Sequence, residues 1–212
     1  ASLAKIRIRR EYEHVRFVYV PSTIGSGMAT AKTGSFYLTE TVTIPGGSGA
    51  GQRVQGTIDL GAYVNVATGQ AIAIDQVDFV LQSGDTFQQT ANAMLGGNGG
   101  VGFQLTDLNP GTAFVRADNQ SLIASGSVSI DDPNNIATHT LDLFPDNYGT
   151  AGSLSEMFMV VNDTLYLTGG NDGAAIQAGA DLAITARVRA RVVKLGSKDW
   201  MALALQSTAS DN

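Results

Sequence analysis

The sequence predicts an all-β fold, an antiparallel β-sandwich with one or two short helices. Apolar and polar residues alternate along many short segments, which is the pattern of half-buried strands. Clusters of Gly, Pro, Asn and Asp separate these segments, and no strand pattern alternates with long helices. A length of 212 residues suits one sandwich. We therefore expect a single domain over residues 1–212, with a short flexible tail from about 207 to 212.

The clearest alternation covers residues 184–192. Five apolar residues share one face of this expected strand, and Arg187, Arg189 and Arg191 share the other. Residues 5–9 repeat the pattern on a smaller scale. The remaining expected strands are rich in β-branched and aromatic residues and cover 15–20, 35–44, 53–60, 71–81, 101–106, 113–117, 122–130, 138–143 and 157–167.

Turn chemistry marks the connections. A glycine-rich tip occupies 45–51, and further turns are expected at 109–111, 131–135 and 169–173. Two segments have helical features. Residues 85–95 begin with an N-cap type Asp and end before two glycines, and residues 197–205 would bring one Trp, one Leu and one Ala together on a face.

The composition excludes several classes of protein. Cysteine is absent, so disulfides, thiolate metal sites and cysteine nucleophiles are excluded. No apolar run reaches the roughly 18 residues of a membrane span. The net charge of -6 argues against a general nucleic-acid binder. The charge is uneven, however, because ten of the 13 basic residues lie in two short segments near the ends of the chain.

No catalytic motif is present. The two histidines, His14 and His139, lack a triad context, and Ser48 lies in a glycine loop rather than at a strand-to-helix turn. Asp75 and Asp78 are three positions apart, an odd separation, so an alternating strand would point them to opposite faces, which disfavours a joint carboxylate role. We expect a protein that is not an enzyme and has no small-molecule substrate.

Calcium is the most plausible ion. Asp131, Asp132 and Asn134 are weak candidate ligands, because they offer several oxygen atoms within one loop. The alternative, which we favour, is that these side chains bond their own turn. No cofactor is therefore expected, and calcium stays open.

Two rows of basic residues form the most specific feature. Like charges side by side on a strand repel each other, so compensating acids are expected from this chain, from a neighbouring subunit or from phosphates. We expect an interaction surface that pairs with the acidic centre of another copy, with nucleic acid or an internal membrane as alternatives. The two rows are also expected to lie close together. They consist of Lys5, Arg7, Arg9, Arg187, Arg189 and Arg191.

The basic opening strand at 6–20, the glycine-rich tips at 45–51, 96–100 and 169–173, and the basic closing strand at 183–194 resemble the jelly-roll coat proteins of viruses. The resemblance implies a jelly-roll sandwich that assembles into a symmetric shell and is located in the virion. Its partners would be copies of itself and other virion proteins. The sequence departs from many small coats, because it lacks a long basic arm.

A second class of function stays open. An extracellular binding or adhesion module, of the carbohydrate-binding or surface-layer type, has a similar composition. Carbohydrate sites display exposed aromatic residues, and Tyr63, Tyr148 and Tyr166 are available. Particle size distinguishes the two classes, because a coat forms large assemblies and a binding module stays monomeric.

Overall fold

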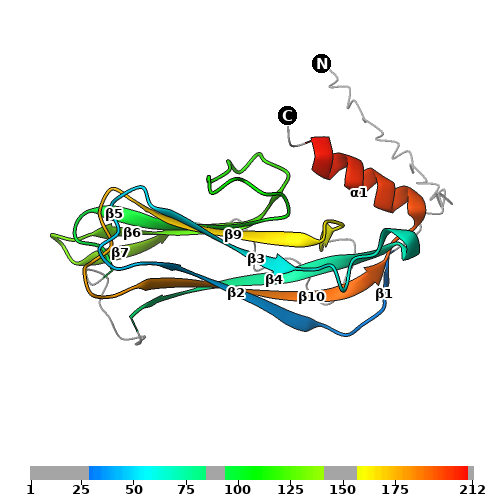
Figure 1. Cartoon of the computed structure of the whole chain (residues 1–212), viewed down its shortest axis with the longest axis horizontal. Coiled ribbons are helices and arrows are strands. Elements are labelled where there is room, and N and C mark those ends of the chain that lie inside the picture. The colour runs from blue at the N-terminus through cyan, green and yellow to red at the C-terminus, as the bar shows by residue number, and fades with distance from the viewer. Residues whose placement is uncertain (1–28, 85–93, 141–156, 210–212) are drawn as a thin grey trace, which may run out of the picture.

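The computed structural model describes residues 29–84, 94–140 and 157–209. Two antiparallel sheets pack face to face, which confirms the β-sandwich (Figure 1). Sheet A contains β1 (Thr30–Ala31), β2 (Phe36–Ile44), β4 (Gln70–Ser83), β8 (Phe158–Val160) and β10 (Leu182–Lys194). Sheet B contains β3 (Arg53–Asp59), β5 (Gly99–Thr106), β6 (Leu122–Asp131), β7 (Ile136–Thr140) and β9 (Thr164–Asp172). The helical elements are η1 (Val66–Thr68) and α1 (Ser197–Ala209).

The strand pairing is that of a jelly roll. β2 pairs with β10, β3 with β9, β4 with β8 and β5 with β6, so the first half of the chain pairs with the second half in reverse order. This paired ribbon is rolled into two sheets, with the order β2-β10-β4-β8 in one and β3-β9-β5-β6 in the other. Eight strands in two Greek keys define this architecture.

The core lies between the two sheets. From β10, Ile184, Ala186, Val188 and Ala190 are fully buried, as the alternation predicts. Phe103 of sheet B meets Phe79 of β4 with 4.7 Å between ring centroids. Complete burial of one large apolar side chain is worth about 1.5–3 kcal/mol, so the alternating faces supply the main force that holds the sheets together.

A second apolar cluster lies on the outer side of sheet A, beneath α1. Ala71, Ala73, Val193 and Leu195 are buried there, and the helix covers them. The helical side chains packed against this cluster are Trp200, Leu203 and Ala204, which confirms the predicted helix and its apolar face.

The helix is longer than expected. It continues through Ala209, so the prediction of a flexible tail from 207 is wrong for residues 207–209. The physical reason is that no Gly or Pro interrupts the segment after Leu205. In the part of the chain that the structure describes, no helix has both the length and the apolar character to cross a membrane.

Two predicted strands differ in the structure. The segment 157–167 is interrupted, because Val161 to Asp163 form the connection between β8 and β9. Residues 113–117 form no strand. They belong to the long connection between β5 and β6, and this difference places Phe114 on the outside of sheet B.

The glycines at 169–170 belong to β9 rather than to a turn. A Cβ atom at Gly169 would lie 2.6 Å from Cδ1 of Ile184, and a Cβ atom at Gly170 would lie 2.7 Å from the backbone oxygen of Gln52. Close packing, rather than a turn, therefore requires glycine here. Only Gly173, just after the strand, has a positive φ, of 84°.

Several predictions fall outside the described residues. These are the strands expected at 5–9 and 15–20, most of the helix expected at 85–95, and the end of the strand expected at 138–143. The expected closeness of the first and last basic strands therefore stays a prediction.

Candidate functional site

The arginines of β10 lie on the outer face of sheet A. Arg187 is exposed and Arg189 and Arg191 are partly buried, whereas Ala186, Val188 and the other residues between them face the core. β2 and β4 flank β10 on its two sides over most of its length. The predicted arginine row is therefore confirmed for this strand. Lys5, Arg7 and Arg9 lie outside the described residues.

A β-bulge changes the orientation of one acid. Arg189 is paired with Gln76, but the next residue, Ala190, is paired with Ile74, so Asp75 is an extra residue in β4. A bulge shifts the alternation of side chains by one position. Asp75 and Asp78 therefore both face the arginines, since Asp78 is paired with Arg187. The expectation that the two acids face opposite ways is wrong for this reason.

Asp75 bridges two of the three arginines. Nε of Arg189 donates to Oδ1 of Asp75 at 2.7 Å, and Nη2 of Arg191 donates to Oδ2 at 3.1 Å. The Asp75 side chain is only 6% exposed, so the acid is shielded from water, whereas the Arg189 side chain is 36% exposed. The hydrogen bond from Arg189 to Asp75 raises the pKa of Arg189 above its ordinary value. The chain thus supplies part of the compensating charge itself.

Arg187 is the arginine that faces solvent most openly. Its guanidinium carbon lies 5.2 Å from the ring centroid of Tyr37 on β2, and that tyrosine is 52% exposed. Asp78, opposite Arg187, accepts hydrogen bonds from Gln76 at 2.9 and 3.1 Å. Arg187 and Tyr37 therefore form the part of this face that is available to another molecule.

The candidate calcium ligands lie in the turn between β6 and β7. Nδ2 of Asn134 donates to Oδ2 of Asp131 at 2.7 Å, and the backbone N–H of Asn135 donates to the carbonyl of Asp132 at 3.1 Å. The backbone N–H of Asp132 also donates a hydrogen bond to Oδ1 of Asn98 at 2.9 Å. Within the described residues, no group of three or more His, Cys, Asp or Glu side chains could hold a metal ion. These contacts favour the turn-stabilising role, and the calcium site stays a prediction.

Asp107 is a buried acid that the sequence did not single out. It follows β5 and lines a cavity of about 160 Å³ with Asn162, Asp163 and Tyr166, among others. Burial raises its pKa from 3.8 to about 6, although its backbone hydrogen bond and the amide of Asn162 act in the other direction. Its Oδ1 atom has no hydrogen-bond partner in the described part of the chain. Asp107 therefore carries a proton more readily than an ordinary aspartate.

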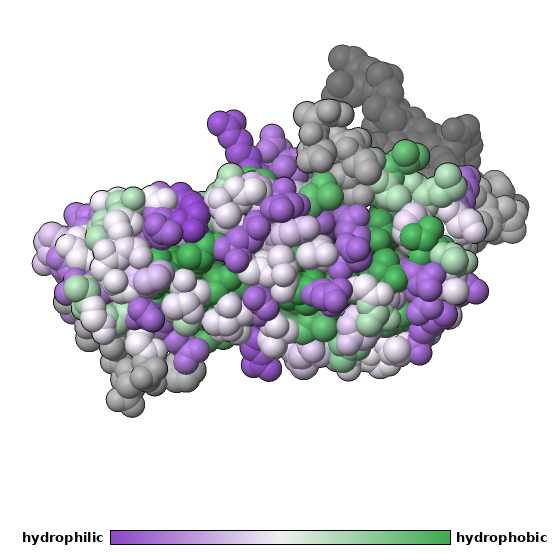
Figure 2. Space-filling view, in the orientation of Figure 1, coloured by the Kyte–Doolittle hydropathy of each residue, from purple (hydrophilic) through white to green (hydrophobic). Residues whose placement is uncertain are grey.

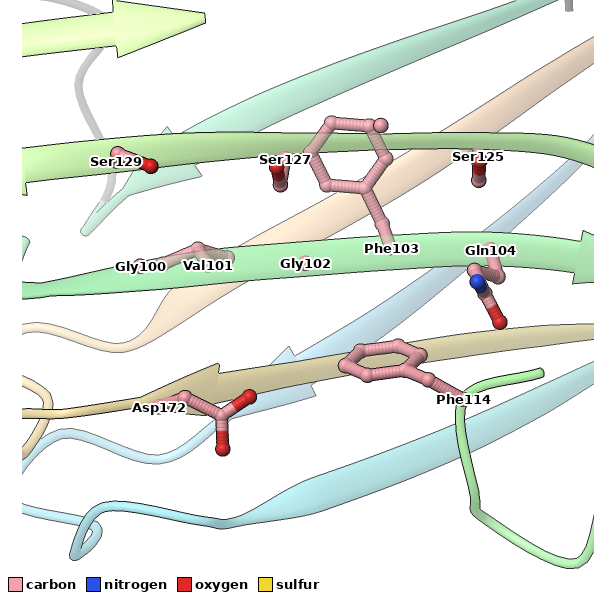
Figure 3. Close-up of a pocket in the computed structure, with 11 residues that line it drawn as sticks. Gly100, Val101, Gly102, Phe103, Gln104, Phe114, Ser125, Ser127, Ser129 and Asp172 are labelled. Carbon is pink, nitrogen blue, oxygen red and sulfur yellow. The ribbon is translucent and has the colours of Figure 1, made fainter. Parts of the chain in front are cut away.

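The outer face of sheet B has a groove of about 320 Å³ (Figure 3). Its floor is formed by β5 and β6, and Phe114 reaches it from the connection between these strands. The sequence does contain a signal for it, because small residues recur at every second position in both strands. The lining residues are Gly100, Val101, Gly102, Phe103, Gln104, Phe114, Ser125, Gly126, Ser127, Ser129 and Asp172.

Two of the tyrosines that were candidates for carbohydrate stacking, Tyr63 and Tyr166, do not line this groove. Tyr63 stacks on Phe36 with 5.1 Å between ring centroids, and Tyr166 lines the cavity at Asp107. Tyr148 lies outside the described residues. Phe114, which the sequence placed in a strand, supplies an aromatic ring at the groove, whereas the ring of Phe103 packs on Phe79 in the core.

Comparison with known proteins gives no relative from which a role could be inferred. No protein-family model matches the chain, and no curated protein sequence matches it.

Proposed function

We propose that this chain is a structural coat subunit, which assembles with copies of itself into the symmetric shell of a virion. The observation that carries the proposal is the jelly-roll pairing, in which β2:β10, β3:β9, β4:β8 and β5:β6 form one rolled ribbon. Viral capsid domains are among the proteins that use this architecture. A fold does not by itself define a function, so the proposed coat role also needs support from features of the surface.

Exposed apolar residues at one end of the molecule support assembly. On α1, Met201 is 63% exposed and Leu205 is 67% exposed, and the two are one helical turn apart. Val66 of η1 is 66% exposed, and η1 adjoins the start of α1 through a 2.8 Å hydrogen bond from Leu195 to Gly69. Figure 2 shows hydrophobic residues on the surface at this end. Such a patch is typical of a contact between proteins.

The arginine face supplies a second contact of a different kind. Because Asp75 already compensates Arg189 and Arg191, we assign the intersubunit role to Arg187 with Tyr37. Tyrosine and arginine are both enriched at the centres of protein interfaces. The acidic middle of a neighbouring copy is the partner with complementary charge.

Particle size tests the proposal. The full chain is purified and studied by analytical ultracentrifugation and negative-stain electron microscopy over a range of protein and salt concentrations. Closed particles of uniform size are the expected result. A monomer under every condition contradicts the proposal and favours an extracellular binding module.

A further inference from the structure

The groove on sheet B exists because its floor lacks large side chains. Gly102 of β5 is paired with Gly170 on one side and with Ser127 on the other, and Gly100 is paired with Ser129. Residues directly opposite in a sheet face the same way, so these small residues form one patch. Ser125, Ser127 and Ser129 follow at every second position along β6 (Figure 3). The result is a hollow floored by backbone and hydroxyl groups.

An aromatic wall is held beside this floor. Gln104 clamps the connection that carries Phe114, because its Nε2 donates to the carbonyl of Val115 and its Oε1 accepts from the Val115 N–H, both at 2.8 Å. A Cβ atom at Gly102 would lie 3.1 Å from Cε2 of Phe114, so the ring lies closely over the strand. The wall is therefore part of the folded structure and needs no ligand to form.

A second residue, Arg53, packs on the Phe114 ring. The guanidinium carbon of Arg53 lies 4.5 Å from the centroid of the Phe114 ring. The same guanidinium donates to both carboxylate oxygens of Asp172, at 2.9 and 2.8 Å. Arg53 thus fixes the ring from outside the groove and neutralises the acid at the end of the groove. Arg53 itself does not line the groove.

The lining determines the chemistry of a ligand. Among the described residues that line the groove none is basic, and the one acid among them, Asp172, is paired with Arg53. A phosphate or a nucleic acid would find no positive charge there, whereas a neutral ligand leaves the Arg53–Asp172 pair intact. An aromatic ring beside hydroxyl groups suits a molecule with one apolar face and many hydroxyls. A volume of about 320 Å³ is at the lower end of the range for small-molecule sites.

We propose that this groove binds a neutral saccharide. The apolar C–H face of a sugar ring packs on the side of Phe114 away from Arg53, where burial of apolar surface stabilises it. Sugar hydroxyls exchange hydrogen bonds with Ser125, Ser129 and the carboxylate of Asp172. Gly100, which has no side chain and is not covered by Phe114, lets the sugar ring approach the sheet closely. This role goes beyond the proposed assembly, and it requires no contact between subunits.

The test is ligand-observed saturation-transfer NMR on the full chain, which works for a single subunit and for an assembled particle. The probes are maltose, cellobiose, lactose and chitobiose, with glucose 6-phosphate as a charged comparison. At least one neutral disaccharide is expected to bind, with a dissociation constant on the order of 1 mM, and the charged sugar is expected to bind more weakly.

Two variants locate the binding. Phe114→Leu keeps an apolar side chain but removes the ring, and it is expected to weaken binding about tenfold. Tyr63→Leu removes a partly buried aromatic ring that does not line the groove and serves as the matched control, with binding unchanged. Ser129→Leu, at an exposed position, fills the groove without touching the Phe114 wall and is also expected to weaken binding. Circular dichroism checks that each variant is folded.

Two outcomes overturn the proposal. One is the absence of saturable binding by every neutral disaccharide tested. The other is binding that both folded groove variants, Phe114→Leu and Ser129→Leu, leave at the wild-type level.

Discussion

Asp75 accepts a 2.7 Å hydrogen bond from Nε of Arg189, across a bulge that turns this acid toward the outer face of sheet A. The contact brings together residues that are 114 positions apart in the chain. It also changes the interpretation of the arginine row, since two of its members are held by an acid of the same chain and one is left to face other molecules.

Replacement of Asp75 by Asn is expected to destabilise the fold by about 2 kcal/mol, because it leaves two partly exposed arginines without their counter-charge. Urea unfolding at neutral pH measures the change. Asp78→Asn on the same strand is the matched control and should cost less than about 1 kcal/mol, because Asp78 is less buried. Equal losses of unfolding free energy in the two variants would show that the ion pairs of Asp75 do not stabilise the fold more than the contacts of Asp78 do.

Charge reversal of Arg187 tests the intersubunit role. Arg187→Glu is expected to leave the subunit folded and to impair assembly, since the exposed residue changes sign without breaking the Asp75 bridge. The comparable change at Arg191 is unsuitable, because it would place a carboxylate against buried Asp75. Arg116→Glu, an exposed change on the other side of the sandwich, is the control. Normal particles from Arg187→Glu in sedimentation would remove Arg187 from the interface.

The apolar pair on α1 gives an independent test of assembly. Met201→Ser combined with Leu205→Ser is expected to reduce particle formation, because both side chains are exposed in the subunit and contribute little to its own core. Thermal melting should change little. The inward-facing Leu203→Ser is the contrasting variant and should lower the melting temperature instead. Wild-type assembly by the double variant would exclude this end of the molecule from the subunit contacts.

Asp107 predicts a pH dependence of stability. Its folded pKa of about 6 exceeds the ordinary 3.8, so the folded state holds the proton more tightly than the unfolded state between these values. The free energy of unfolding therefore falls as pH rises from about 4 to above 6, by about 3 kcal/mol from this group.

The Asp107→Asn variant isolates this contribution. The variant is expected to lose the part of the pH dependence of the free energy of unfolding that Asp107 causes. It is also expected to be more stable than the wild type at pH 8, because a neutral amide avoids the cost of a buried charge. Urea unfolding at several pH values provides the measurement, with the exposed Asp163→Asn as control. Parallel pH profiles for wild type and Asp107→Asn would contradict the assignment.

The glycine at 170 is expected to be intolerant of a side chain. In Gly170→Ala the new Cβ atom would lie 2.5 Å from Cδ of Arg53 and 2.7 Å from the Gln52 carbonyl, so both the strand pairing and the Arg53–Asp172 pair are disturbed. A loss of about 1–3 kcal/mol follows from overpacking of this size. Gly49→Ala meets no atom within 4 Å and should be nearly neutral in the same denaturation assay. If Gly170→Ala leaves the free energy of unfolding unchanged, the prediction is wrong, and the neighbouring backbone and Arg53 can shift at little cost.

Local features were predicted well where they depend on period alone. The arginines of β10 share a face because a strand alternates its side chains whatever it pairs with. Trp200, Leu203 and Ala204 cluster because helical spacing brings them together. Phe114 was placed wrongly, since a short run of β-prone residues does not show whether a neighbouring strand is present to pair with it.

The amino-acid pattern by itself therefore determined that the chain is an antiparallel sandwich with a basic row on its last strand. The pairing order of the jelly roll, the bulge at Asp75 and the groove beside Phe114 required the three-dimensional structure. The physical reason is that alternation records which side of a strand is buried, a local property. Register, bulges and strand partners depend on contacts between distant segments, such as Asp75 with Arg189, and no local period encodes those contacts.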